Sequence, residues 1–141
     1  MRRRQLRSFV LLLALGAAAS CSSPTQPSSF PASVEVVRIY GSLPPVTVTT
    51  APGTIRVTGA IVMNVPCYRF TSTASGQHDT LVVTLIAIVR GEICTQDVAA
   101  FSYTITVIGV RSGLLPMRLV YDRYGLPEYA EIALEQTVLV P

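Results

Sequence analysis

Short stretches rich in β-branched residues and Tyr, separated by Gly and Pro, run from residue 34 to the end of this chain. Such residues favour strands, and Gly and Pro mark the turns between them. The stretches recur about every 8–15 residues, as in antiparallel sandwiches and barrels, and none keeps the 3.6-residue period of a helix. We therefore predict eight strands, at 34–40, 46–50, 54–63, 67–72, 81–89, 101–110, 117–121 and 136–140.

Three segments carry further detail. Along 101–107, apolar side chains alternate with hydroxyl side chains, which predicts a strand with one buried and one solvated face. The stretch 81–89 is apolar on both faces apart from Thr84, so we expect it at the centre of its sheet. The turn-rich segment 73–79 predicts a hairpin, whereas 127–136 fits either a short helical turn or a strand.

The first 21 residues have the three-part layout of an export signal. Four Arg lie in 1–7, an apolar run covers 9–19, and small residues lead to Cys21. The run has 11 residues, whereas a helix that spans a bilayer needs about 20. Ala18-Ala19-Ser20-Cys21 resembles the lipobox of bacterial lipoproteins, with Ala18 where Leu is commonest. An ordinary export signal that happens to end before a Cys is the alternative.

The lipobox resemblance implies a processed and anchored protein. Residues 1–20 would be removed as a signal peptide, and Cys21 would carry acyl chains such as palmitate, which anchor stably when two or more are present. We expect 21–33 to be the lipidated Cys and a flexible Ser/Pro linker, ahead of a β-sandwich domain at 34–141. Ser22 is not the Asp that retains such lipoproteins in the inner membrane, so the resemblance favours the outer membrane.

The charge balance argues against a nucleic-acid partner. Beyond residue 20 the chain has seven Arg against eight acidic residues, a net charge of −1. A nucleic-acid-binding domain needs a basic face of its own. The high isoelectric point of the whole chain therefore reflects the leader.

The Cys count predicts one disulfide. With Cys21 acylated, Cys67 and Cys94 remain, and an exported protein lies in an oxidising compartment. Closing a loop of 27 residues would stabilise the fold by about 3–4 kcal/mol. The alternative, a metal or redox pair, lacks CxxC spacing and has only one distant His.

The body of the chain resembles the small Ig-like domains of bacterial envelope lipoproteins, which implies an antiparallel β-sandwich of about seven to eight strands. The residues that carry this resemblance are Gly59, Pro66-Cys67-Tyr68, Cys94, Tyr103 and the segment 113–120. Antibody-type domains place a Trp on the disulfide and a Tyr two residues before the second Cys. Here Trp is absent and Tyr103 lies nine residues after Cys94. We therefore expect the disulfide to pin a loop rather than the core.

Candidate catalytic groups are few. His78, the single His, lies beside Asp79 in a predicted turn that also holds hydroxyl residues. Nucleophilic catalysis needs an orienting third group and a pocket as well, so we interpret His78 as a solvated turn residue. Glu128, Glu131 and Glu135 could share one helical face, and we interpret them as solvated rather than as a glycosidase pair.

We predict no metal site and no cofactor. Copper would require Met and His at exposed positions, and the candidates are Met63, His78 and Met117. Both Met residues lie in predicted strands, which favours a place in the core.

One segment is a candidate binding loop, Tyr121-Asp122-Arg123-Tyr124. Tyr offers a large contact area at low entropic cost, although a turn with half-buried Tyr is the alternative. We therefore expect a non-enzymatic, lipid-anchored envelope module that binds an unidentified protein or glycan. The alternatives are a small periplasmic hydrolase or carbohydrate-processing accessory, and an inhibitor or chaperone that binds a protein.

Overall fold

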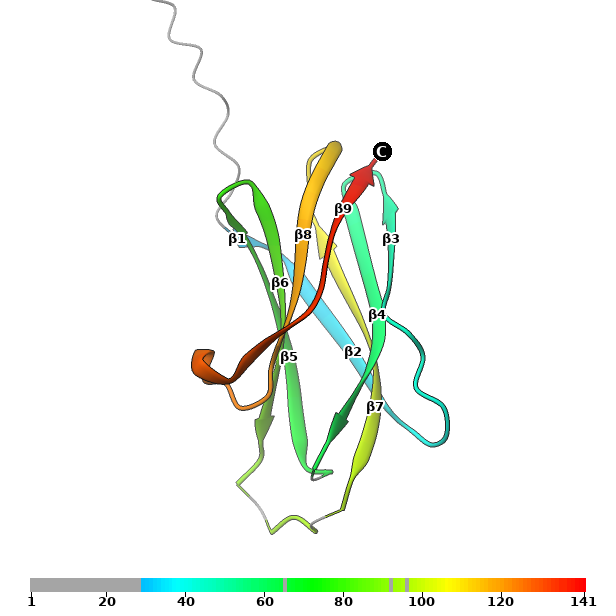
Figure 1. The fold of residues 1–141 in the computed structure, drawn as a ribbon, viewed down its shortest axis with the longest axis vertical. Coiled ribbons are helices and arrows are strands. Elements are labelled where there is room, and N and C mark those ends of the chain that lie inside the picture. Colours follow the sequence, from blue (N-terminus) through cyan, green and yellow to red (C-terminus); the bar gives the residue numbers. More distant parts are fainter. Residues whose placement is uncertain (1–28, 65, 92, 96) are drawn as a thin grey trace, which may run out of the picture.

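The predicted strands assemble into two sheets that pack face to face, which confirms the expected β-sandwich (Figure 1). The computed structural model describes residues 29–141 except 65, 92 and 96. One sheet has the order β1-β5-β6-β8-β9 and the other the order β2-β7-β4-β3. The strands are β1 (Ser29–Phe30), β2 (Ala32–Ile39), β3 (Thr47–Ala51), β4 (Thr54–Met63), β5 (Tyr68–Gln77), β6 (Thr80–Val89), β7 (Ala99–Ile108), β8 (Gly113–Asp122) and β9 (Ala130–Val140).

The sandwich begins earlier than the sequence led us to expect. Residues 29–33, which we placed in the linker, form β1 and the start of β2. Phe30 is the reason, because its side chain is buried in the core, and burying a Phe contributes about 1.5–3 kcal/mol. The signal peptide, Cys21 and the rest of the expected linker lie outside the described residues.

The core lies between the inner faces of the two sheets and confirms both strand-level predictions. β6 is the middle strand of the five-stranded sheet, and its inward side chains from Leu81 to Leu85 are fully buried. In β7, Tyr103, Ile105 and Val107 are buried while the intervening hydroxyl residues are partly exposed. The period-two pattern of β7 therefore predicted its buried and its solvated face correctly.

The β5–β6 hairpin is confirmed, but its turn is tighter than the predicted segment 73–79. β5 continues to Gln77, which pairs with Thr80, so the turn consists of His78 and Asp79 alone. Their φ angles are 46° and 65°, as in the type I′ turns that match the twist of two paired strands. The extension keeps the period of two, since Ala74 is buried in the core while Thr73 and Gln77 are exposed.

In the C-terminal half, one feature was not predicted and one ambiguous segment is resolved. β6 and β8 run parallel, with Leu81 opposite Met117, because β7 lies between them in the chain but in the other sheet. All other pairs are antiparallel. The ambiguous segment 127–136 resolves into a 3₁₀ helix, η1 (Pro127–Tyr129), followed by the first part of β9.

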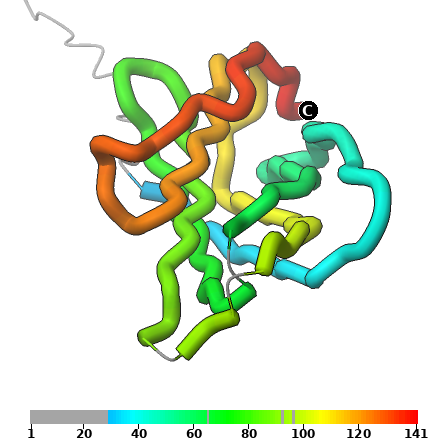
Figure 2. Tube along the Cα trace, turned by 60° about the horizontal axis from the view of Figure 1, so that its bottom comes forward, coloured from blue at the N-terminus to red at the C-terminus, as the bar shows by residue number. Residues whose placement is uncertain are grey.

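The two lateral sides of the sandwich differ. On one side β9 lies against β3, and the Thr50 hydroxyl donates a hydrogen bond to the Leu139 carbonyl at 2.8 Å. On the other side the chain passes from β1 to β2 at Pro31, whose carbonyl accepts a hydrogen bond from the amide of Ile108. Beyond Pro31, β2 and β5 separate (Figures 1 and 2). The sandwich is therefore open along β2 and the lower part of β5.

Candidate functional site: an arginine-rimmed crevice

The open side holds a crevice of about 280 Å³ between the two sheets. Its lining combines aliphatic, aromatic and guanidinium groups, and we call it the arginine crevice. It is lined by Val34, Val36, Arg38, Tyr68, Arg69, Phe70, Arg90 and Phe101.

Strand periodicity explains how these residues converge. Alternate residues of a strand share one face, so Val34, Val36 and Arg38 of β2 line the crevice together. On the opposite sheet, the Phe70 ring of β5 packs against Phe101 of β7, with 5.0 Å between ring centroids. Tyr68 lies beside Phe70, with 6.2 Å between centroids. The crevice therefore has an apolar, aromatic wall.

The predicted disulfide holds one end of this wall. Cys67 and Cys94 are joined, with Cα atoms 5.9 Å apart, and Cys94 lies in the β6–β7 loop, as expected. The disulfide links that loop to the start of β5, and both segments cross between the sheets. The Arg90 amide also donates to the Cys67 carbonyl at 3.0 Å. The disulfide therefore fixes the backbone that carries Tyr68 and Arg90.

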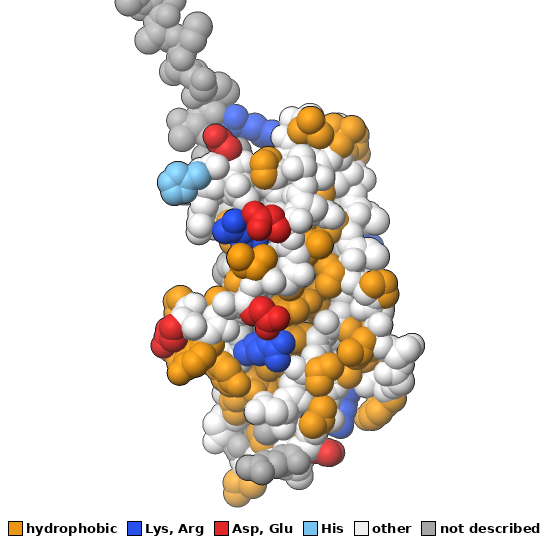
Figure 3. All heavy atoms as spheres, in the orientation of Figure 1, with side chains coloured by type: hydrophobic (Ala, Val, Ile, Leu, Met, Phe, Trp, Pro, Cys, Tyr) orange, Lys and Arg blue, Asp and Glu red, His pale blue; other side chains and the backbone are white. Residues whose placement is uncertain are grey.

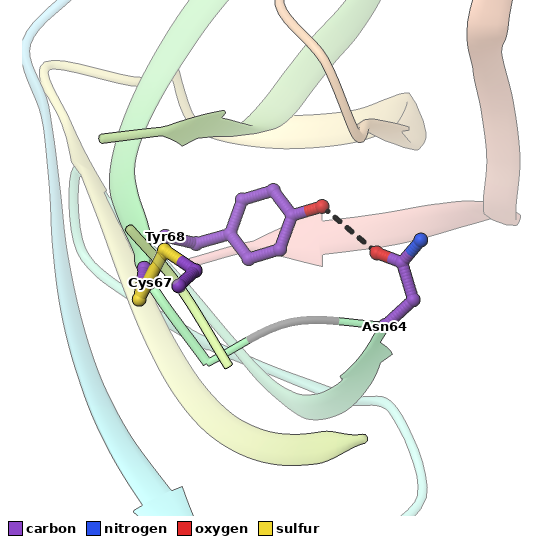
Figure 4. The surroundings of a disulfide bond; sticks show 4 residues. Asn64, Cys67 and Tyr68 are labelled. Carbon is purple, nitrogen blue, oxygen red and sulfur yellow. Dashed lines mark hydrogen bonds between the residues drawn. A yellow bond between two sulfur atoms is a disulfide. The ribbon is translucent and has the colours of Figure 1, made fainter. Parts of the chain in front are cut away.

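The Tyr68 hydroxyl is oriented by a neighbour from the β4–β5 connection. It donates a hydrogen bond to Asn64 Oδ1 at 3.0 Å (Figure 4). Burial raises the pKa of Tyr68, with a smaller contribution from Tyr124 that also raises it and one from Arg123 that lowers it. The phenol is therefore a neutral hydrogen-bonding group at ordinary pH.

Three of the residues that line the crevice are exposed Arg residues. Arg38 lies at the end of β2, with its Cζ atom 5.4 Å from the centroid of the Tyr40 ring. Arg69 belongs to β5, and Arg90 follows β6. None of the three forms an ion pair with a described residue, whereas Arg118 and Arg123 pair with Glu135 and Glu131. Guanidinium groups hold carboxylates and phosphates in bidentate geometry, so the rim suits an anion.

The candidate binding loop is divided by the structure. Tyr121 points into the core, where its hydroxyl lies 2.7 Å from that of Tyr103 and the rings meet edge to face. Burial raises the pKa of both phenols. Arg123 forms an ion pair with Glu131 at 3.2 Å. Of the four loop residues, only Tyr124 is well exposed. Binding at this loop therefore stays a prediction, and Tyr124 is its main contact residue.

The segment between β8 and β9, which contains Tyr124 and η1, forms an apolar protrusion from the five-stranded sheet (Figures 1 and 3). The Tyr124 ring meets that of Tyr129 edge to face at 5.5 Å, and with Leu126 the two line an open hollow. Asp122 shapes this protrusion, because its buried carboxylate accepts hydrogen bonds from the amides of Tyr124 and Leu126, at 3.2 and 2.9 Å.

Asp122→Ala should therefore loosen the protrusion. The change leaves two backbone amides without their acceptor, and we expect the free energy of unfolding to fall by about 1–3 kcal/mol. Asp122→Asn keeps one carbonyl acceptor and should cost less than Asp122→Ala. Urea denaturation measures both, and equal stability of the wild type and Asp122→Ala would show that the two hydrogen bonds contribute nothing.

The groups that we weighed for catalysis or metal binding do not come together. His78 lies directly before β6. The protrusion lies near the other end of β6, because Gly125 is beside Ile88. At the rise of a strand, the length of β6 separates His78 from the protrusion by about 25–30 Å. Glu131 and Glu135 lie on β9, each paired with an Arg. Figure 3 shows such acidic and basic neighbours at two places on the visible face. Met63 and Met117 are buried in the core.

The described residues contain no group of three or more His, Cys, Asp and Glu side chains placed to hold a metal ion. They also contain no helix long and apolar enough to cross a membrane. Comparison of the chain with protein-family models, with curated proteins and with solved structures found no match in any of the three.

Sequence reasoning missed the arginine crevice. Arg38 and Arg90 stand at the ends of predicted strands, and Tyr68 follows a predicted disulfide Cys. Charged residues at strand ends are common, however, so this signal could not show that the three Arg converge.

Proposed function

We propose that this chain is a lipid-anchored protein of the bacterial cell envelope, and that its β-sandwich binds an anionic group of a partner molecule in the arginine crevice. The observation that carries this proposal is the convergence of Arg38, Arg69 and Arg90 on an aromatic wall. A binding module requires a stable framework, and the β-sandwich with its disulfide supports this proposal.

The composition of the crevice supports binding rather than catalysis. Its lining contains Val, Phe, Tyr and Arg. Arg stays protonated in proteins, so it cannot act as a general base, and the raised pKa of Tyr68 keeps its phenol protonated. Guanidinium groups over an aromatic wall suit a ligand that has an anionic end and an apolar or planar body.

The anchor rests on the lipobox resemblance at Cys21, and the placement of the chain ends is compatible with it. β1 begins at Ser29, so seven residues separate it from Cys21, and the eight residue-to-residue steps reach at most about 29 Å. Ser29 and the C-terminus lie at one end of the sandwich, and the β6–β7 loop lies at the other (Figure 1). In the proposed arrangement, the anchored end faces the membrane and the disulfide-bonded end faces away from it.

Phenylphosphate, which combines a planar ring with an anion, is the probe for the crevice. We expect the mature protein in a non-ionic detergent to bind it, with NMR shift changes at Arg38, Arg69 and Arg90. Each single Arg→Gln variant should bind about 5–10-fold more weakly, because one charge-assisted hydrogen bond is lost, and the triple variant should not bind detectably.

Arg111→Gln is the matched control, since Arg111 is exposed but lies in the β7–β8 connection, away from the crevice. Benzyl alcohol is the uncharged control ligand, and added salt should weaken the binding of phenylphosphate. Equal affinity of wild type and triple variant, or equal affinity for the uncharged ligand, would refute binding of anions at this crevice.

A further inference from the structure

β5 has a long edge with which no described strand beyond β1 pairs. β5 has ten residues, but β1 pairs only with Ser75 and Ala74. The opposite edge of β5 is fully paired with β6, from Tyr68 to Gln77. Along an antiparallel strand, successive residues direct their N–H and C=O groups to opposite edges. The hydrogen bond from the Arg90 amide to the Cys67 carbonyl places the odd-numbered residues of β5 against β6. Tyr68, Phe70 and Ser72 therefore direct their amides and carbonyls to the β1 side, in the manner of an edge strand that can accept another chain.

The path of the chain opens part of the space beside this edge, because only the start of β2 stays near β5. β1 runs antiparallel to β5 for two residues and would continue alongside it. At Pro31 the chain instead crosses to the other sheet and enters β2, and β2 then diverges from β5 (Figure 2). The arginine crevice occupies the resulting gap, because Tyr68, Arg69 and Phe70 of the free edge line it together with Val34, Val36 and Arg38 of β2.

We infer that an extended acidic segment of a partner protein pairs with residues 68–73 of β5 as an antiparallel strand that continues the line of β1. This inference rests on the proposed function, since the segment supplies the anionic groups that the crevice binds. Six residues of strand span about 20 Å. Main-chain hydrogen bonds to an exposed edge give such complexes affinity, and side-chain pockets give them specificity.

The side chains of the added strand have two different surroundings. In a strand, successive side chains point to opposite faces. One set would point towards Phe70, Phe101 and Val36, which favours apolar residues. The other set would lie among exposed guanidinium groups such as Arg69, which favours Glu or Asp. The chemistry of the crevice therefore selects a segment in which apolar and acidic residues alternate.

The same charges argue against a second copy of this chain as the occupant. If two β5 edges paired with each other, the Arg69 side chains of both copies would be brought together with the nearby Arg38 and Arg90. Like charges across a strand pair are destabilising, and charged edge residues are a common means of preventing self-association. An acidic segment of a partner removes this repulsion.

A six-residue peptide of alternating Glu and Val, capped at both ends, tests the inference with the mature protein in non-ionic detergent. We expect it to bind and to slow hydrogen exchange of the Tyr68, Phe70 and Ser72 amides at least 10-fold, with little change in the amides that already join β5 and β6. Two control peptides are matched to it, one with Lys in place of Glu and one with the Val amides N-methylated. Both should bind at least 10-fold more weakly, because one loses the charge match and the other loses main-chain hydrogen bonds.

Other results would overturn strand addition. If phenylphosphate binds but the N-methylated peptide binds as well as its parent, the crevice holds anions without strand pairing, so the inference fails while the proposed function stands. If neither phenylphosphate nor any peptide binds, the proposed function fails as well. If no peptide binds and the triple Arg→Gln variant dimerises in analytical ultracentrifugation, the arginines serve only to protect the edge.

Discussion

Loss of the disulfide should lower the free energy of unfolding by about 3–4 kcal/mol. The Cys67→Ala and Cys94→Ala changes together open a loop of 27 residues, which gives the unfolded chain more conformational freedom. The bond also ties the start of β5 to the β6–β7 loop at the end of the sandwich. Because a domain of this size is stable by about 5–15 kcal/mol, the expected loss is a large fraction of the total.

Urea denaturation of the oxidised wild type and the double variant measures this effect. Dithiothreitol should destabilise the wild type by a similar amount and leave the double variant unchanged, which is the internal control. The double variant should also bind phenylphosphate more weakly, since Tyr68 and Arg90 flank the disulfide-bonded backbone. A loss below about 1 kcal/mol would mean that the fold fixes these segments without the covalent bond.

Gly59→Ala should be the most damaging single-methyl addition in the sandwich. Gly59 of β4 lies opposite Tyr103 of β7, and a Cβ atom at Gly59 would overlap the ring and hydroxyl of Tyr103 and approach Val46 Cγ2 at 3.1 Å. The ring cannot move away freely, because its buried hydroxyl is hydrogen-bonded to that of Tyr121 at 2.7 Å. Overpacking of this kind costs about 1–3 kcal/mol or more.

A double-mutant cycle isolates the cause of that loss. Tyr103→Leu removes the ring that Cβ would meet, so Gly59→Ala should cost at least about 1 kcal/mol less in the Tyr103→Leu background than in the wild type. Thermal or urea denaturation of the four proteins provides the cycle. Strictly additive losses would show that Tyr103 is not what excludes a side chain at Gly59.

Local patterns predicted β2 to β9, but they missed β1 and placed the starts of β8 and β9 too late. The alternation along β7 and the apolar run on both faces of β6 are properties of consecutive residues. Because side chains alternate between the two faces of a strand, such patterns predict which face is buried. The disulfide was equally accessible, because it followed from the number of Cys residues and an oxidising compartment.

Features that depend on contacts distant in the chain were not accessible. The start of the sandwich at Ser29 depends on where Phe30 packs, and the parallel pairing of β6 with β8 depends on β7 joining the other sheet. The sequence predicts Asp122 as a candidate binding residue, but its carboxylate accepts hydrogen bonds from the amides of its own loop.

The arginine crevice is the clearest case of a feature hidden in the sequence. Arg38, Arg69 and Arg90 come from three segments, and only the divergence of β2 from β5 brings them around one opening. A register shift of one residue in β2 would turn Arg38 to the other face of its sheet. Sequence spacing alone cannot fix such a register across two sheets.

Mass spectrometry of the full chain recovered from the membranes of the producing cell tests the proposed anchor, on which the envelope role depends. We predict a mature protein that begins at Cys21, lacks residues 1–20 and carries acyl chains on Cys21, whereas Cys21→Ser should remain an uncleaved precursor without acyl chains. A bare thiol at Cys21, or residues 1–20 still attached to the wild type, would contradict a lipid-anchored envelope protein.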